Sequence, residues 1–183
     1  MIRAFLTSFA VGITLHSAAA LAAAPLAFDC DVPADHFSSV TQDFEQPSVS
    51  LQGVVQVREM RSGNNLPVAG VRIADPNTKN MLGFQFVAAS PKAAFFDVVL
   101  NKQVEGKLQK FGFGQVSAKA AISFRLTVDG SGKGSFIVDG NEADFEFPPL
   151  SGSKAMVFCS TGQFKFSELI FQDGPSDPAP AKP

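Results

Sequence analysis

The sequence contains no tryptophan and no tyrosine, although sugar-binding clefts usually stack sugar rings on those two side chains. It also lacks an excess of charge of either sign, since 15 basic residues meet 17 acidic ones for a net charge of -2. Phosphate recognition needs a concentrated basic surface, so this balance argues against nucleic acid as a partner. No Gly-x-Ser-x-Gly elbow and no phosphate-binding loop occur, and no window shows a sustained helical repeat.

Residues 1–24 have the pattern of a secretory signal peptide, with cleavage expected near Ala22. Arg3 supplies the positive charge, residues 4–21 are almost all apolar or small, and small residues precede the expected cleavage site. A membrane anchor needs about 20 apolar residues, and polar residues interrupt this stretch. We therefore expect a periplasmic or secreted protein, without a membrane span in its mature form.

The two cysteines, Cys30 and Cys159, are an even pair without Cys-x-x-Cys spacing. In an oxidising compartment such a pair predicts a structural disulfide, which would bring the two ends of the domain together. The alternative is two free thiols or a metal pair. A closed zinc site needs four ligands, and His36 is the only histidine left after signal removal.

Short runs that alternate apolar and polar residues dominate the rest of the chain. The clearest is residues 122–128, which a glycine-rich turn at 129–134 joins to a second run at 135–138. Further runs lie at residues 40–44, 53–59, 69–74, 81–87, 93–100, 111–117, 144–147, 154–159 and 163–171. About ten short strands over residues 25–172 predict an all-β domain, an antiparallel β-sandwich of jelly-roll type. The proline-rich residues 173–183 are predicted to be a disordered tail.

Phenylalanine supplies nearly all the aromatic side chains, with 19 in the chain. Four pairs stand two residues apart and so share a sheet face, where we expect core packing: Phe84/Phe86, Phe111/Phe113, Phe145/Phe147 and Phe164/Phe166. Phe95 and Phe96 are adjacent, so in a strand they point to opposite faces. One of them is therefore expected to be exposed.

The hairpin at residues 122–138 and the glycine-led run at 158–171 resemble the closing half of a concanavalin A-like (laminin G-like) jelly roll. The resemblance covers the C-terminal third of the chain. It implies two antiparallel sheets with a binding site on the concave sheet or its rim loops.

The segment Glu142-Ala143-Asp144-Phe145-Glu146 resembles the Glu-x-Asp-x-Glu strand of retaining endo-β-glucanases in that superfamily. The resemblance implies Glu142 as nucleophile, Asp144 as the residue that tunes it, and Glu146 as acid/base. Retaining hydrolysis needs carboxyl groups about 5–5.5 Å apart, whereas strand positions four apart are about 13 Å apart. The same alternation also fits a strand with one solvated face and one core face.

Hard oxygen ligands for calcium are available in two turns, at Asp75 with Asn77 and at Asp139 with Asn141. Turn chemistry explains these residues equally well, so no cofactor is predicted. A nucleophilic site would have to use His36, which lies in a stretch interpreted as a loop.

The leading functional hypothesis is a non-catalytic binding or interaction module whose partner is a glycan or a protein surface. The expected contact regions are the concave sheet and the loops around residues 61–67, 75–80 and 147–154. A small retaining glycoside hydrolase using the three carboxylates is the second hypothesis. A structural envelope or matrix protein that self-associates through sheet edges is the third.

Overall fold

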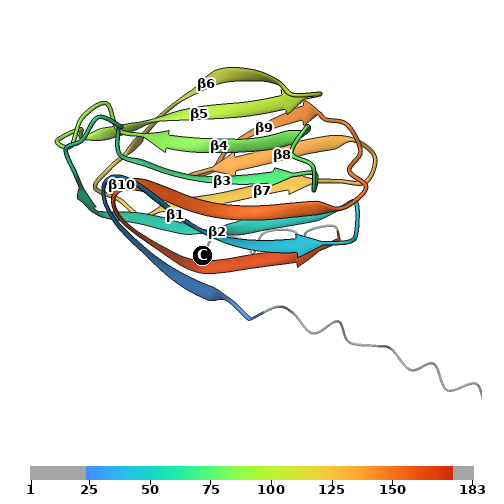
Figure 1. Cartoon of the computed structure of the whole chain (residues 1–183), viewed down its shortest axis with the longest axis horizontal. Coiled ribbons are helices and arrows are strands. Elements are labelled where there is room, and N and C mark those ends of the chain that lie inside the picture. The colour runs from blue at the N-terminus through green and yellow to red at the C-terminus, as the bar shows by residue number, and fades with distance from the viewer. Residues whose placement is uncertain (1–23, 175–183) are drawn as a thin grey trace, which may run out of the picture.

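The computed structural model describes residues 24–174, so the predicted signal peptide and most of the predicted tail lie outside the described residues. Ten strands form the fold (Figure 1). They are β1 (Leu26–Phe44), β2 (Val49–Met60), β3 (Val68–Ala74), β4 (Met81–Val87), β5 (Phe95–Val104), β6 (Lys107–Ser117), β7 (Ile122–Val128), β8 (Lys133–Val138), β9 (Asn141–Glu146) and β10 (Ser153–Asp173). All neighbouring pairs are antiparallel, which confirms the predicted all-β class.

The strands form one sheet that curls until its two halves face each other (Figure 1). The strands follow the order β6-β5-β4-β3-β10-β2-β7-β8-β9, in which β10 is the central strand. The strand β1 stands outside this order and pairs with the other edge of β10. The first half of β10 pairs with β3 through residues 154–160, and the second half pairs with β2 through residues 162–173. One layer is therefore β1-β10-β3-β4-β5-β6 and the other is β1-β10-β2-β7-β8-β9, the arrangement of a jelly roll.

The two strands that connect the layers are long, which corrects the expectation that all strands would be short. The predicted runs at 154–159 and 163–171 are a single 21-residue strand that bends at Thr161, where φ is 55°. β1 has 19 residues and bulges between Val32 and Phe37, so Cys30 lies within the first strand rather than before it. His36 lies in this bulge, exposed, with its Nδ1 2.8 Å from the carbonyl oxygen of Ala34.

The core between the layers consists mainly of phenylalanine rings. Phe84 of β4 contacts Phe124 of β7 and Phe136 of β8, with ring centroids 6.0 and 5.6 Å apart. The predicted pairs Phe84/Phe86 and Phe164/Phe166 are fully buried. The pair Phe111/Phe113 departs from prediction, because Phe111 lies on the edge strand β6 and is 47% exposed. The expectation for the adjacent pair is confirmed, with Phe95 exposed and Phe96 buried.

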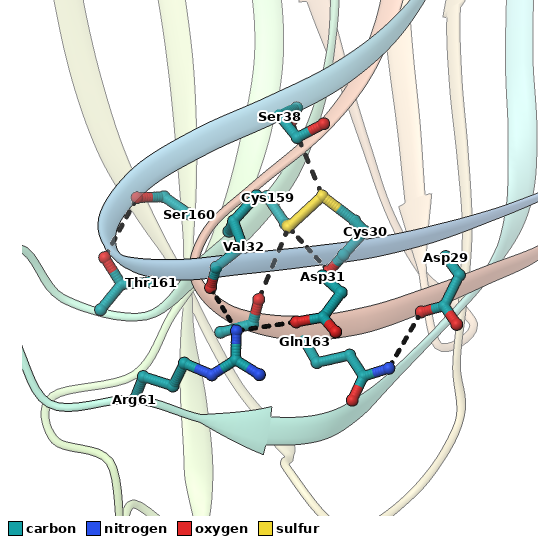
Figure 2. The surroundings of a disulfide bond; sticks show 11 residues. Asp29, Cys30, Asp31, Val32, Ser38, Arg61, Cys159, Ser160, Thr161 and Gln163 are labelled. Carbon is teal, nitrogen blue, oxygen red and sulfur yellow. Dashed lines mark hydrogen bonds and ion pairs between the residues drawn. A yellow bond between two sulfur atoms is a disulfide. The ribbon is translucent and has the colours of Figure 1, made fainter.

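The predicted disulfide joins Cys30 to Cys159 across the bend of the β1–β10 pair (Figure 2). The register places Cys30 opposite Phe164 and Cys159 opposite Ser38, so the bridge links different rungs of the ladder. Cys30 lies on the side of the bend that belongs to one layer, and Cys159 lies on the side that belongs to the other. The bond therefore fixes how the two layers meet.

Candidate functional site

A groove lies on the outer face of the layer β1-β10-β3-β4-β5-β6. Two adjoining hollows, of about 670 and about 120 Å³, share the side chains of Arg72, Gln85, Lys110 and Phe158. Strand register brings these residues together, because Phe158 pairs with Gly70 and Arg72 is followed across the sheet by Gly83, Asn101 and Lys110. The groove thus runs across the strands rather than along them.

Two aromatic rings form the end of the groove near β1. Phe37 is 56% exposed, and its ring centroid lies 5.5 Å from that of the nearly buried Phe158. A Cβ atom at Gly70 would lie 2.6 Å from Cζ of Phe158 and 2.8 Å from the carbonyl oxygen of Phe84. The absence of a side chain at Gly70 therefore leaves the space that the Phe158 ring occupies over β3.

Arg72 is the charged centre of the groove. Its guanidinium carbon lies 5.9 Å from the centre of the Phe158 ring. Burial lowers the pKa of this guanidinium, yet arginine stays protonated at neutral pH. Within residues 24–174 no carboxylate forms an ion pair with Arg72. A partly buried cation without an anionic partner costs free energy that a polar or anionic ligand would recover.

Two amides lie between the cations. Gln85 of β4 and Asn101 of β5 both line the groove, and Asn101 is only 6% exposed. Neither side chain makes a hydrogen bond within the described part of the chain. Gln85 is half-buried, and the polar atoms of neither amide are among the fully buried ones without a partner. Both amides can therefore offer donors and acceptors to a ligand at the surface of the groove.

The loop at residues 61–67 forms the rim of the groove beside Phe37. Asp35, in the β1 bulge, accepts hydrogen bonds from the backbone N–H groups of Asn64 and Asn65, at 3.0 and 2.6 Å. These two bonds hold the pKa of Asp35 below its usual value, because they stabilise the charged carboxylate. Asn64, Asn65 and Leu66 line the groove, so the bulge of β1 positions its rim.

The three carboxylates of the Glu-x-Asp-x-Glu segment lie on the other layer. Glu142, Asp144 and Glu146 are exposed on the edge strand β9, and the intervening Ala143 and Phe145 pack against the core. Asp144 and Glu146 line a hollow of about 400 Å³, whereas Glu142 is outside its lining. The structure thus brings two of the three candidates to one concave surface.

The four calcium-ligand candidates lie in two turns that use them locally. Asp75 Oδ2 accepts hydrogen bonds from the backbone N–H and the amide of Asn80, and Asn77 Oδ1 accepts one from the backbone N–H of Lys79. Asp139 adopts a positive φ of 48° in the β8–β9 turn, and Asn141 donates to the carbonyl oxygen of Val138. Across residues 24–174, no group of three or more His, Cys, Asp or Glu side chains is placed to hold a metal ion.

Of the three contact loops expected from the sequence, only residues 61–67 line the groove. Phe147, Pro148 and Pro149 border a separate hollow near Lys102. The groove residues of the strands were not identified from the sequence, although Arg72 and Gln85 show a usable signal as polar residues between buried neighbours. The sequence does not show which strands pair, and it is this pairing that brings the groove residues together.

Solved structures share this fold at low sequence identity. An alginate lyase from an Alteromonas species aligns with a TM-score of 0.53 and 11% identity, covering 81% of this chain and 86% of that chain. The CBM2 module of the evolved Dit protein of a Lactobacillus casei phage aligns with a TM-score of 0.54 and 9% identity, covering 73% and 67%. An alginate lyase from Pseudomonas aeruginosa gives 0.53 and 15%, covering 71% and 67%.

These neighbours show that the fold is a concanavalin A-like jelly roll. No protein-family model matches the sequence, and no curated protein matches it. Among the described residues, no helix has the length and apolar character needed to cross a membrane.

Proposed function

We propose that the mature chain is an exported, non-catalytic module that binds a glycan in the groove on the outer face of β1-β10-β3-β4-β5-β6. One observation carries the proposal. A hollowed sheet face combines an exposed aromatic ring, Phe37, with the polar side chains Arg72, Gln85 and Asn101, which make no side-chain hydrogen bond or ion pair among the described residues.

Sugar rings match this combination in two ways. Their C–H faces are apolar and pack against aromatic rings such as Phe37 and Phe158, which substitute here for the missing Trp and Tyr. Their hydroxyl groups both donate and accept hydrogen bonds, as the amides of Gln85 and Asn101 do. A few polar groups that fix orientation beside a larger apolar contact are typical of ligand sites.

The structural neighbours and the covalent structure support the same proposal. One neighbour is named as a CBM2 module and two are named as alginate lyases, so the fold accommodates proteins that act on carbohydrates. The Cys30–Cys159 disulfide fits an oxidising compartment, and the signal-like residues 1–24 fit export to one.

The groove has little to offer for catalysis. Its lining includes no carboxylate, histidine or thiol, and these are the side chains most used for proton transfer and nucleophilic attack. A glycoside hydrolase based on Glu142, Asp144 and Glu146 would instead place its site on β9, in the other layer. The binding-module hypothesis and the hydrolase hypothesis therefore predict ligand binding on different layers of the molecule.

Replacing Phe37 with alanine is expected to weaken glycan binding by roughly 5- to 30-fold, because removing an aromatic anchor at an interface costs about 1–2 kcal/mol. The matched control is Phe95→Ala, since Phe95 is 55% exposed and lies outside the groove. Affinities would be measured by isothermal titration calorimetry with oligosaccharides selected on a glycan array that includes neutral and anionic glycans.

The proposal predicts a loss for Phe37→Ala and an unchanged affinity for Phe95→Ala. Equal affinities for the two variants would contradict a role for this groove. Failure of the native protein to bind any glycan on the array would also contradict it, and would favour a protein partner.

A further inference from the structure

The charges in the groove differ from those of the rest of the molecule. The chain has more acidic than basic residues, yet the groove is lined by Arg72 and Lys110 and by no carboxylate. The hollow on the other layer is lined by Asp129, Asp144 and Glu146 with a single lysine. A cationic groove on an acidic protein indicates selection for an anionic ligand by charge complementarity.

Neither groove cation is neutralised by its own fold. Within residues 24–174 the ion pairs involve only Arg61, which contacts Asp31 and Glu59, and Lys154, which contacts Asp43. The nearest acid on the same strand face as Asn101 is Asp97, four residues along β5 and therefore about 13 Å away along the strand. The Asp97 carboxylate already accepts a hydrogen bond from Gln115 at 2.8 Å.

Gly83, on the neighbouring strand β4, leaves the space that Arg72 needs in the groove. A Cβ atom at Gly83 would lie 2.7 Å from Cβ of Arg72 and 2.5 Å from the carbonyl oxygen of Val71. Any side chain at position 83 would therefore displace Arg72 from the groove floor. Gly83 stands between Arg72 and Asn101 in the ladder, so its missing side chain also leaves open space between the charged and amide groups.

The two cations are arranged for an extended ligand. Arg72 and Lys110 lie three strand spacings apart, which is about 14 Å between their backbones, with Asn101 between them. Both side chains nevertheless line the hollow of about 120 Å³, so an anionic group held there would lie beside both cations. A chain of sugars carrying such a group would continue across the strands into the adjoining hollow, which Phe37 lines.

From this arrangement we infer that the ligand is an anionic polysaccharide whose carboxylate or sulfate groups contact Arg72 and Lys110 while its rings pack on Phe37. The inference rests on the proposed glycan-binding function and names the ligand class for the same groove. Carboxylate and sulfate share the chemistry that arginine recognises, which is charge-assisted hydrogen bonding to paired oxygens.

The test compares ligands that differ only in charge. Polygalacturonate and alginate oligosaccharides would be titrated beside their carboxyl-reduced, neutral forms, and dextran sulfate oligosaccharides beside dextran. We expect the native protein to bind at least one anionic form about tenfold or more tightly than its neutral counterpart, with an affinity that falls as salt is added. Tighter binding of the uronates than of their carboxyl-reduced forms would identify carboxylate as the recognised group. Tighter binding of dextran sulfate than of dextran would identify sulfate.

The variants localise the effect. Arg72→Gln is expected to weaken binding of the anionic form by about 10- to 100-fold, the usual loss for a hydrogen bond to a charged group, and to leave the neutral form nearly unchanged. Arg58→Gln is the matched control, because Arg58 is exposed on β2 outside the groove. Thermal unfolding of both variants would show that each remains folded.

Equal binding of charged and neutral forms, or equal affinities for Arg72→Gln and Arg58→Gln, would overturn the inference. The proposed function would still hold in that case if Phe37→Ala weakened binding of the neutral glycan. Absence of binding to every charged and neutral form would overturn both.

Discussion

A variant with alanine in place of both Cys30 and Cys159 is expected to lose about 2–5 kcal/mol of its free energy of unfolding, the usual cost of removing a disulfide from a small secreted domain. The bridge joins residues 129 positions apart, and chain entropy alone gives about 5 kcal/mol for a loop of that size. Alanine is preferred to serine because both cysteines are buried, where an unpaired hydroxyl would add its own cost.

Denaturant titration of the oxidised protein, the reduced protein and the double-alanine variant would measure this loss. Reduced native protein serves as the control, and it should match the double variant. A loss of less than about 1 kcal/mol would show that the bend of the β1–β10 pair holds without the bridge. It would also show that the fold does not require an oxidising compartment.

Replacing Phe136 with alanine is expected to lower the free energy of unfolding by about 3–5 kcal/mol, the range for truncating a buried phenylalanine. Phe136 is fully buried in β8, and its ring lies 5.6 Å from Phe84, 4.4 Å from Phe113 and 5.3 Å from Phe145. It therefore connects β4 and the edge strands β6 and β9 across the interior, and its loss would leave a cavity between the layers.

The matched control for this variant is Phe111→Ala, which removes a half-exposed ring from β6 and should change stability by less than about 1 kcal/mol. If Phe136→Ala fails to fold, Phe136→Leu should fold with a smaller loss, since leucine retains most of the apolar volume. Equal losses for Phe136→Ala and Phe111→Ala would contradict the assignment of this ring to the core.

The sequence predicted most strands because their alternation is local. Residues 81–87 and 122–128 were located without error as β4 and β7, and the disulfide pairing was recovered from two cysteines alone. The bend in β10 was mistaken for a strand end, and the part of β1 before residue 40 was not predicted as a strand. Asp35 and Thr161 resemble turn residues locally, and only pairing with a partner strand shows that each chain continues through them.

The groove could not be predicted from the sequence for a related reason. Phe37, Arg72, Gln85, Lys110 and Phe158 come from five strands spread over more than a hundred residues, and the order of strands in the sheet brings them together. The three carboxylates, in contrast, lie within five consecutive residues, so the sequence alone is enough to group them. The groove residues become neighbours only when the strands pair.

Amide chemical-shift mapping of the native protein during titration with uronate oligosaccharides would locate the binding face directly. The largest changes are expected at Phe37, Arg72, Gln85 and Lys110, on the outer face of β1-β10-β3-β4-β5-β6. Changes centred on Asp144 and Glu146 of β9, with this face unaffected, would contradict glycan binding in the groove.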